Sequence, residues 1–225
     1  MAIIRSIYRP SYLRRKNLGT MANINFKERV IDCKIVYYGP GRSGKTTNLE
    51  YIFRKYRKNT LREMVSINTK GDRTLFFDFL PLGVGKIKGC DVKIQLFTVP
   101  GQPKYSSTRK MVLKGVDGVV FVADSLKIRK KDNLWSLKDL RDNLAAQDKK
   151  IMRIPLVFQY NKQDLTEKGL SIVPVKEMER SLNSRLKAPS FSASALTGKE
   201  VGATLIQCIK LTIGSLRSEL NAGIK

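Results

Sequence analysis

A complete phosphate-binding motif occupies residues 39–46 and constrains the fold more than any other feature. It reads Gly39-Pro40-Gly41-Arg42-Ser43-Gly44-Lys45-Thr46 and matches the pattern G-x-x-x-x-G-K-[ST]. An apolar run at 35–38 precedes the motif, and a helix-forming run begins at Thr47. Glycines let a backbone approach an anion closely, so that its N–H groups and the following helix N-terminus bind phosphates. This strand–loop–helix context predicts a nucleoside triphosphate ligand.

Two side chains that close the motif carry the chemistry expected beside a triphosphate. Lys45 is expected to reach the outer phosphates, and Thr46 offers a hydroxyl to Mg²⁺. Mg²⁺ is a hard cation that takes oxygen ligands from protein, phosphate and water together. The sequence therefore predicts that Mg²⁺ accompanies the nucleotide.

A second motif, Asn161-Lys162-Gln163-Asp164, directly follows the apolar run at 155–160. The carboxylate of Asp164 can accept hydrogen bonds from the ring N–H and the exocyclic amine of guanine, whereas adenine presents a mismatched edge. We expect Asn161 to meet the ring N7 and to tie back to the phosphate-binding loop, with the stem of Lys162 along the base. Together with the upstream motif, this tetrad predicts guanine specificity.

A third segment, Ser194-Ala195-Leu196, follows the last predicted strand and fits a loop whose backbone N–H contacts the base carbonyl. The residues expected to contact GTP or GDP, the predicted ligands, are Gly39, Gly41, Arg42, Ser43, Gly44, Lys45, Thr46, Thr47, Gly101, Asn161, Lys162, Asp164, Ser194, Ala195 and Leu196.

Apolar strand-like runs alternate with amphipathic helices, which predicts an α/β fold with helices on both faces of a sheet. The predicted strands are 34–38, 75–80, 92–99, 118–124, 156–161 and 190–193, and helices are expected from about Lys45, Asn133, Val175 and Val201. A hairpin-like step at 80–85 predicts that the second strand runs antiparallel to the others in a mostly parallel, six-stranded sheet. Ligands of such sheets bind at the carboxyl ends of the strands.

The chain of 225 residues is expected to form one domain, residues 23–225, preceded by a basic arm, residues 1–22. Residues 1–20 contain five basic side chains and no acidic one, and we expect a disordered tail there. A targeting peptide and initiation at Met21 are alternatives for this arm.

The lack of a long apolar run predicts a cytoplasmic protein, and the lack of histidine excludes histidine-based catalysis.

The chain carries 43 Lys and Arg against 19 Asp and Glu, a formal net charge of +24, which should attract polyanions. The excess is spread over several clusters, among them 54–58 and 129–131, and no nucleic-acid-binding module accompanies them. Nucleic acid is therefore an unlikely partner. Solvated helix faces and electrostatic docking to a membrane or a partner both remain open.

The order and spacing of these motifs resemble those of Ras-like small GTPases from Met21 to near the C-terminus. Longer matches narrow the resemblance to the MglA type of bacterial polarity GTPase: residues 33–41, 72–81, 98–102 and 114–124. The resemblance implies a monomeric switch, active with GTP, that is turned off with help from a dimeric activator of the MglB or Roadblock type. It further implies effectors and an exchange factor of unknown identity, and recruitment to a cell pole or the inner face of the membrane.

The resemblance also implies roles for three further residues. Thr74 would close on Mg²⁺ and the terminal phosphate, and Gln102 would orient the attacking water. Arg73 would act as an arginine finger that the GTPase itself supplies, so that the activator repositions residues instead of donating one. With Lys45, these residues form the expected catalytic set, and Thr46 and Thr74 are the expected metal ligands.

One departure from most Ras-like proteins is Thr98, which stands where an aspartate usually holds a magnesium-bound water. Either the metal site depends more on phosphate and Thr46, or a carboxylate such as Asp78 or Asp124 compensates. The departure motivates one alternative function, a GTP-binding scaffold that does not hydrolyse. The net charge motivates another, an RNA- or ribosome-associated GTPase.

Overall fold

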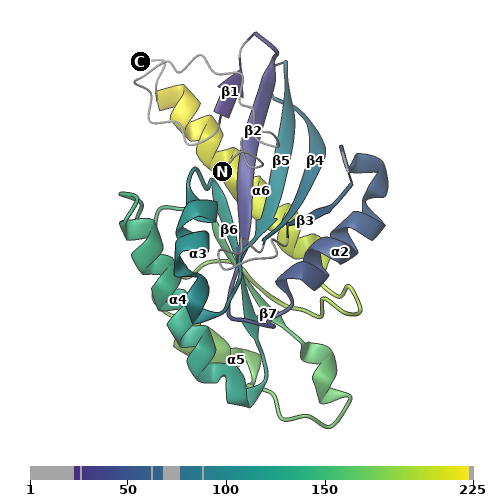
Figure 1. Ribbon diagram of the computed structural model, residues 1–225, viewed down its shortest axis with the longest axis vertical. Coiled ribbons are helices and arrows are strands. Elements are labelled where there is room, and N and C mark those ends of the chain that lie inside the picture. The colour runs from purple at the N-terminus through teal and green to yellow at the C-terminus, as the bar shows by residue number, and fades with distance from the viewer. Residues whose placement is uncertain (1–22, 26, 62, 68–76, 88, 223–225) are drawn as a thin grey trace.

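A single mixed β-sheet forms the centre of the molecule (Figure 1). The computed structural model describes residues 23–25, 27–61, 63–67, 77–87 and 89–222. The strands run in the order β3-β4-β5-β2-β6-β7-β8, with β1 paired to β2. Their bounds are β1 Asn23–Asn25, β2 Val30–Tyr38, β3 Val65–Ile67, β4 Phe77–Ile87, β5 Cys90–Thr98, β6 Gly118–Asp124, β7 Leu156–Asn161 and β8 Ser190–Ser192.

Strand directions confirm the predicted mostly parallel sheet. Strands β2, β5, β6, β7 and β8 are parallel, and β4 pairs antiparallel with β5. The sequence did not predict the short strands β1 and β3, which pair antiparallel with β2 and β4. Each has three residues, too few to show an alternating pattern.

The predicted turn at 80–85 is wrong, because these residues lie inside β4. Leu80 and Leu82 are buried, and the chain reverses farther on, around Gly89, whose φ is +79°. Pro81 is tolerated within the strand because its backbone polar groups lie on the side of β4 that faces away from β5. On that side, beyond the residues that pair with β3, its carbonyl accepts from the N–H of Leu61 at 3.0 Å. The antiparallel direction of the strand was predicted correctly, from the wrong turn.

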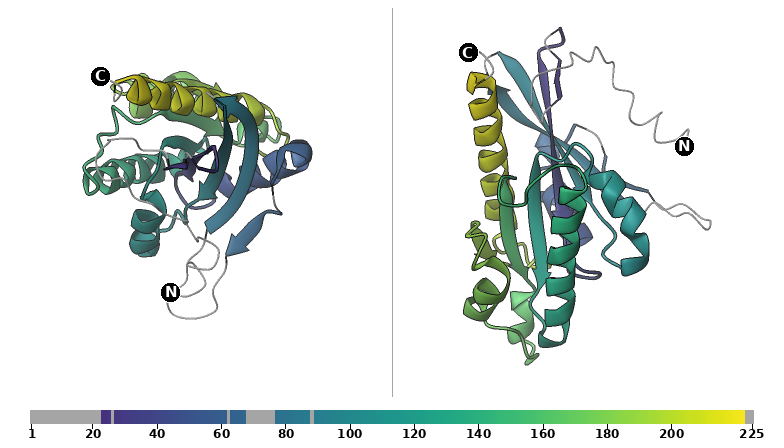
Figure 2. Two further views of the ribbon diagram at one scale, coloured as in Figure 1. Left: turned by 90° about the horizontal axis from the view of Figure 1, so that it is seen from above. Right: turned by 90° about the vertical axis from the view of Figure 1, so that its left-hand side faces the viewer.

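Helices cover both faces of the sheet, as expected. They are α2 Lys45–Lys55, α3 Ser106–Leu113, α4 Lys130–Ala145, α5 Val175–Met178, which continues as a π-helical turn at Glu179–Asn183, and α6 Val201–Ala222. Helices α2 and α6 pack with Ile35 and Tyr37 of β2 in one core, whereas α3, α4 and α5 pack with Val36 and Tyr38 in another. Figure 2 shows α6 and α4 on opposite sides of the sheet. The alternation along β2 thus divides its side chains between two cores.

The sequence did not predict α3. Its eight residues begin with Ser106, Ser107 and Thr108, which have modest helix propensity, and a turn of 3-10 helix at Pro103–Tyr105 leads into it. Tertiary contacts therefore stabilise this helix, notably those of Arg109, which is buried within it.

A buried carboxylate joins β2 and β6 at the amino end of the sheet. Asp117, only 6% exposed, accepts from the N–H of Lys34 at 2.6 Å, and its own N–H donates to the carbonyl of Lys34 at 2.9 Å. Burial raises the pKa of Asp117 to about 7, although the N–H of Lys34 and the charges of Lys149 and Lys34 oppose the rise. Burial also lowers the pKa of the Lys34 ammonium to about 8.

The raised pKa of Asp117 predicts a pH-dependent contribution to stability. Its carboxyl stays protonated in the folded chain well above the ordinary value of 3.8, so its contribution is fully present below about pH 4 and is lost as pH rises toward 7. Lys34 acts in the opposite direction and outside this window, because the lowered pKa of its ammonium costs stability that is recovered as pH rises from about 8 to 10.5. Urea unfolding at pH 4.5 and pH 7 should show a smaller loss of unfolding free energy in Asp117→Asn than in the wild type. Asp91→Asn, at an exposed position, is the control and should lose as much unfolding free energy as the wild type. Equal losses in Asp117→Asn and the wild type would contradict this expectation.

Candidate functional site

The phosphate-binding loop leaves the carboxyl end of β2, and close contacts require two of its glycines, Gly39 and Gly44. Gly39 has φ +140°, and a β-carbon there would lie 2.2 Å from the carbonyl oxygen of Val122. Gly44 has φ +96°, and a β-carbon there would lie 2.3 Å from the side-chain nitrogen of Asn161. The loop is therefore held against both β6 and the last residue of β7.

Lys45 places a buried positive charge within this loop. Its side chain is 7% exposed, and Nζ donates to the carbonyls of Gly39 at 3.0 Å and Pro40 at 2.7 Å. The first turn of α2 begins at the same residue, so its helix dipole adds positive potential to that of the ammonium. The arrangement favours an anion at the loop.

The other predicted residues of the loop differ in exposure. Arg42, at φ +64°, and Thr46 are exposed, and Thr47 is half-buried. The Ser43 side chain is fully buried, and its hydroxyl makes no hydrogen bond within the described structure. The sequence did not indicate this burial, since serine at a loop position is ordinarily exposed.

Asn161, the last residue of β7, connects two loops that are far apart in the sequence. Its Nδ2 donates to the carbonyl of Ser43 at 2.7 Å, and its Oδ1 accepts from the N–H of Ala195 at 2.7 Å. The residue is 1% exposed. The tie to the phosphate-binding loop was predicted, and the geometry confirms it. The tie to Ala195 was not predicted, and it brings the Ser194–Ala195 segment into the same cluster.

The remaining base-site residues surround this cluster. Lys162, in the left-handed conformation at φ +73°, directs Nζ to Asp124 Oδ2 at 2.7 Å. Asp164 lies half-buried in the turn Gln163–Thr166, and Leu196 is exposed. Ser194 is buried, and its hydroxyl accepts from the N–H of Thr197 at 3.2 Å.

Asp124 and Arg129 make contacts within the site that the sequence did not predict. The Asp124 carboxylate, 1% exposed, accepts from Lys162 and from the N–H of Leu126 at 3.1 Å, and Arg129 Nε lies 3.8 Å away. Arg129 also donates to the carbonyl of Gly41 at 2.7 Å. From the sequence, Arg129 belongs to the basic cluster 129–131, for which a solvated helix face and electrostatic docking were both open. Its spacing gives no sign of this long-range contact.

These contacts weaken one explanation for Thr98. Asp124 is one of two carboxylates considered as a substitute for the missing aspartate. Its Oδ1 accepts from the N–H of Leu126, and its Oδ2 contacts Lys162 and Arg129, so both oxygens already have partners. The side chain of Asp78 lies outside the described structure. Thr98 itself is buried at the end of β5, 3% exposed. Of the remaining predicted residues, Arg73 and Thr74 lie outside the described residues.

Gly101 brings the segment after β5 directly against the phosphate-binding loop. A β-carbon at Gly101 would lie 2.2 Å from the backbone nitrogen of Gly41 and 2.3 Å from the carbonyl carbon of Pro40. Gln102 follows at once and is exposed, and its Cγ lies 3.6 Å from the position of a β-carbon on Gly41. The structure thus brings Gln102 to the phosphate end of the site.

The described residues provide hydroxyls rather than a carboxylate cluster for a cation. Among them no group of three or more Cys, Asp and Glu side chains gathers, and the chain has no histidine. Thr46 at the start of α2 supplies a hard oxygen donor, which fits Mg²⁺ when phosphate supplies further oxygens.

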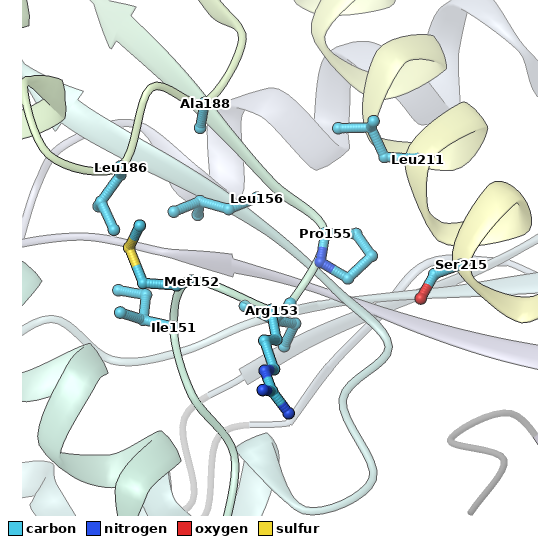
Figure 3. A pocket seen from close by; sticks show the side chains of 10 residues that line it. Ile151, Met152, Arg153, Pro155, Leu156, Leu186, Ala188, Leu211 and Ser215 are labelled. Carbon is cyan, nitrogen blue, oxygen red and sulfur yellow. The ribbon is translucent and has the colours of Figure 1, made fainter. Parts of the chain in front are cut away.

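A separate cavity of about 280 Å³ lies away from these loops (Figure 3). Pro155 and Leu156, at the amino end of β7, line one side, and Leu211 and Ser215 of α6 line another. Because the phosphate-binding and base-site segments follow the carboxyl ends of the strands, this cavity is not part of the nucleotide site.

Within the described part of the chain, the helices are too short or too polar to span a bilayer.

Comparisons with known proteins agree with the geometry. The model of the Ras family matches residues 34–213. The chain is also 50% identical over 197 residues to a protein described as mutual gliding-motility protein MglA, from Myxococcus xanthus (strain DK1622). The match covers 88% of this chain and 98% of that protein.

The ties of Asn161 predict that Asn161→Ala loosens two loops at once. Loss of a buried, doubly hydrogen-bonded amide should lower the free energy of unfolding by about 1–3 kcal/mol, because the Ser43 carbonyl and the Ala195 N–H lose their partner. Hydrogen exchange at the Ala195 amide should become faster. Asn59→Ala, at an exposed position, is the control and should leave this exchange rate unchanged. If Asn161→Ala also leaves it unchanged, the hydrogen bond between Asn161 and Ala195 contributes little.

The contact of Gly101 with Gly41 predicts that Gly101→Ala displaces one of the two segments. A methyl group 2.2 Å from the Gly41 nitrogen cannot be accommodated without a backbone shift. Nucleotide affinity, measured by titration calorimetry, should fall by about tenfold or more. Gly214→Ala on α6, where a β-carbon meets no atom within 4 Å, should leave the affinity unchanged. Wild-type affinity in Gly101→Ala would refute the expected clash.

Proposed function

The chain belongs to the Ras family of small GTPases, which hydrolyse GTP, and we propose that it is a switch whose slow hydrolysis a protein activator accelerates. The observation that carries the proposal is the convergence of three segments on Asn161. They are the phosphate-binding loop, the tetrad that begins at Asn161 and the Ser194–Ala195 segment. This arrangement supports the proposal that the phosphate-binding loop and Asp164 act on one nucleotide at the same edge of the sheet.

Guanine recognition is assigned to the turn after β7. Asp164 is half-buried and available to accept two hydrogen bonds from guanine, while the neighbouring Lys162 is held by Asp124 beside the base position. The carboxylate would be left unpaired by adenine, which makes ATP a poor ligand. GDP and GTP share this contact, so the state of the switch must be read at the phosphate end.

Hydrolysis is assigned to groups at the phosphate end. Lys45 and the backbone N–H groups of the loop would hold the phosphates, and Gln102 would orient the attacking water. Arg73 is proposed as a finger supplied by the chain itself, with an effect of about 10³ to 10⁵ on rate when it is in place. Thr46 and Thr74 would hold Mg²⁺, which supplies positive charge at the β- and γ-phosphates.

The GTP state is proposed to rearrange the segment after Pro100, creating a surface for effectors. Gly101 is already packed on the loop that would hold the terminal phosphate. A contact this close couples a change at the phosphates to the backbone of the next residues. The segment that carries Gln102 is therefore suited to report the nucleotide state.

The biological role is proposed from the relative, whose name assigns it to gliding motility. We propose that this chain controls polarity or motility, with a dimeric activator of the MglB or Roadblock type, effectors and an exchange factor as partners. Four exposed cations lie in 54–58, at the end of α2 and just beyond: Arg54, Lys55, Arg57 and Lys58. Such a surface supports electrostatic recruitment to an anionic membrane, whereas no nucleic-acid-binding module supports an RNA-directed role.

Single-turnover phosphate release from GTP tests the proposed reaction. The wild type should hydrolyse slowly, and addition of a dimeric Roadblock-domain protein should accelerate it. Gln102→Leu should lower the stimulated rate by about hundredfold with GTP affinity within about twofold, because the variant cannot orient water. Gln207→Leu on α6 serves as control. The proposal is wrong if the dimer has no effect and Gln102→Leu matches the wild type.

A further inference from the structure

We infer that Arg109 is a positioning residue for GTP hydrolysis, which holds the backbone that carries Gln102 at a fixed place relative to the phosphate-binding loop. This inference rests on the proposed role of Gln102 in orienting water. Arg109 lies on α3, seven residues beyond Gln102. Neither the motifs nor the resemblance pointed to it.

Arg109 is a buried cation with a fixed partner. Its side chain is 1% exposed, and a guanidinium buried to this extent requires compensation by opposite charge. Asp139 of α4 provides it through two contacts, Nε to Oδ2 at 2.7 Å and Nη2 to Oδ1 at 3.3 Å. This two-point pairing fixes the plane of the guanidinium as well as its position.

The remaining donors of Arg109 are directed to the backbone around Gln102. Nη1 donates to the carbonyls of Gln102 at 2.5 Å and Pro100 at 3.2 Å, and Nη2 approaches the carbonyl of Pro103 at 3.4 Å. Three carbonyls within four residues therefore accept from one side chain. Packing of α3 against α4 alone would not require these contacts, which set the path of the segment.

The same carboxylate also fixes the entry to the phosphate-binding loop. The hydroxyl of Tyr38 donates to Asp139, and Nδ2 of Asn143 donates to Asp139 Oδ2 at 3.0 Å and to the Tyr38 hydroxyl at 3.1 Å. Tyr38 is the last residue of β2, and Gly39 follows it. Burial, and then Asp139, raise the pKa of the Tyr38 hydroxyl, so it stays protonated and continues to donate.

Asp139 thus connects the two parts of the site that hydrolysis requires in register. One path runs through Tyr38 to the loop that would bind the phosphates, and the other runs through Arg109 to the carbonyl of Gln102. Reacting groups must be aligned closely, and misplacement by about 1 Å can lower a rate by about 10²-fold. The network therefore acts on the rate of hydrolysis rather than on nucleotide affinity.

Arg109→Lys tests this role because it retains the charge and removes the planar fork. Single-turnover hydrolysis by the full-length protein should slow by about 10- to 100-fold, while the GTP dissociation constant changes less than about twofold. In a Gln102→Ala background, Arg109→Lys should cause no further slowing. Arg141→Lys, an exposed arginine of α4 that pairs with its neighbour Asp142, is the matched control.

A second variant keeps the test decisive if Arg109→Lys does not fold. Tyr38→Phe removes one hydroxyl from Asp139 and leaves Arg109 and Asn143 as its partners. It should slow hydrolysis by about threefold to tenfold, again with unchanged GTP affinity and no effect in the Gln102→Ala background. Emission from Trp135, the single tryptophan, reports the local fold, because the Arg109 guanidinium lies 5.1 Å from its ring centroid.

The outcomes separate the two proposals. If Gln102→Ala alone hydrolyses GTP as the wild type does, the proposed role of Gln102 is wrong and this inference falls with it. If Gln102→Ala slows hydrolysis but the folded Arg109→Lys and Tyr38→Phe variants do not, the positioning role alone is overturned. Equal slowing by Arg109→Lys in both backgrounds, or slowing matched by a loss of GTP affinity, would likewise overturn it.

Discussion

The side-chain amide of Asn161 is the interaction on which the rest of the site depends. Its two hydrogen bonds connect the carbonyl of Ser43 with the N–H of Ala195, and so connect the loop after β2 with the loop after β8. Because Asn161 itself ends β7, three strands contribute to one buried contact. A ligand bound at either end of the site therefore meets loops that are already arranged with respect to each other, which reduces the cost of ordering them.

The parallel sheet explains why these segments meet. Strands β2, β5, β6, β7 and β8 point in one direction, so the loops that follow them emerge at the same edge. Glycines permit the closest approaches, since a β-carbon at Gly44 would collide with Asn161 and one at Gly101 would collide with Gly41. Buried charges then set the orientation of the loops: Lys162 and Arg129 converge on Asp124, and Arg109 binds Asp139.

The elements that the sequence predicted are those with a local signal. The strand 118–124 is an apolar run that ends in Asp124, and both of its ends were predicted correctly. The motif at 39–46 indicated both its loop and the helix after it. Long-range contacts had no such signal. The hydrogen bonds from Arg129 to the carbonyl of Gly41 and from Arg109 to the carbonyl of Gln102 come from arginines whose spacing is ordinary. Helix α3 likewise begins with residues of modest helix propensity. The turn predicted at 80–85 failed because Gly83 and Gly85 belong to an irregularity within the β4–β5 pairing rather than to its end.

We infer from these contacts that Asn161 makes the phosphate and base ends of the site one unit. Calorimetric titration of inorganic tripolyphosphate with Mg²⁺, a ligand that has no base, tests it most directly in the wild type and in Asn161→Ala. The variant should bind tripolyphosphate about fivefold to a hundredfold more weakly, because the Ser43 carbonyl and its loop lose their anchor. An unchanged affinity for tripolyphosphate, alongside a reduced affinity for guanosine, would show that Asn161 serves the base alone and does not connect the two ends of the site.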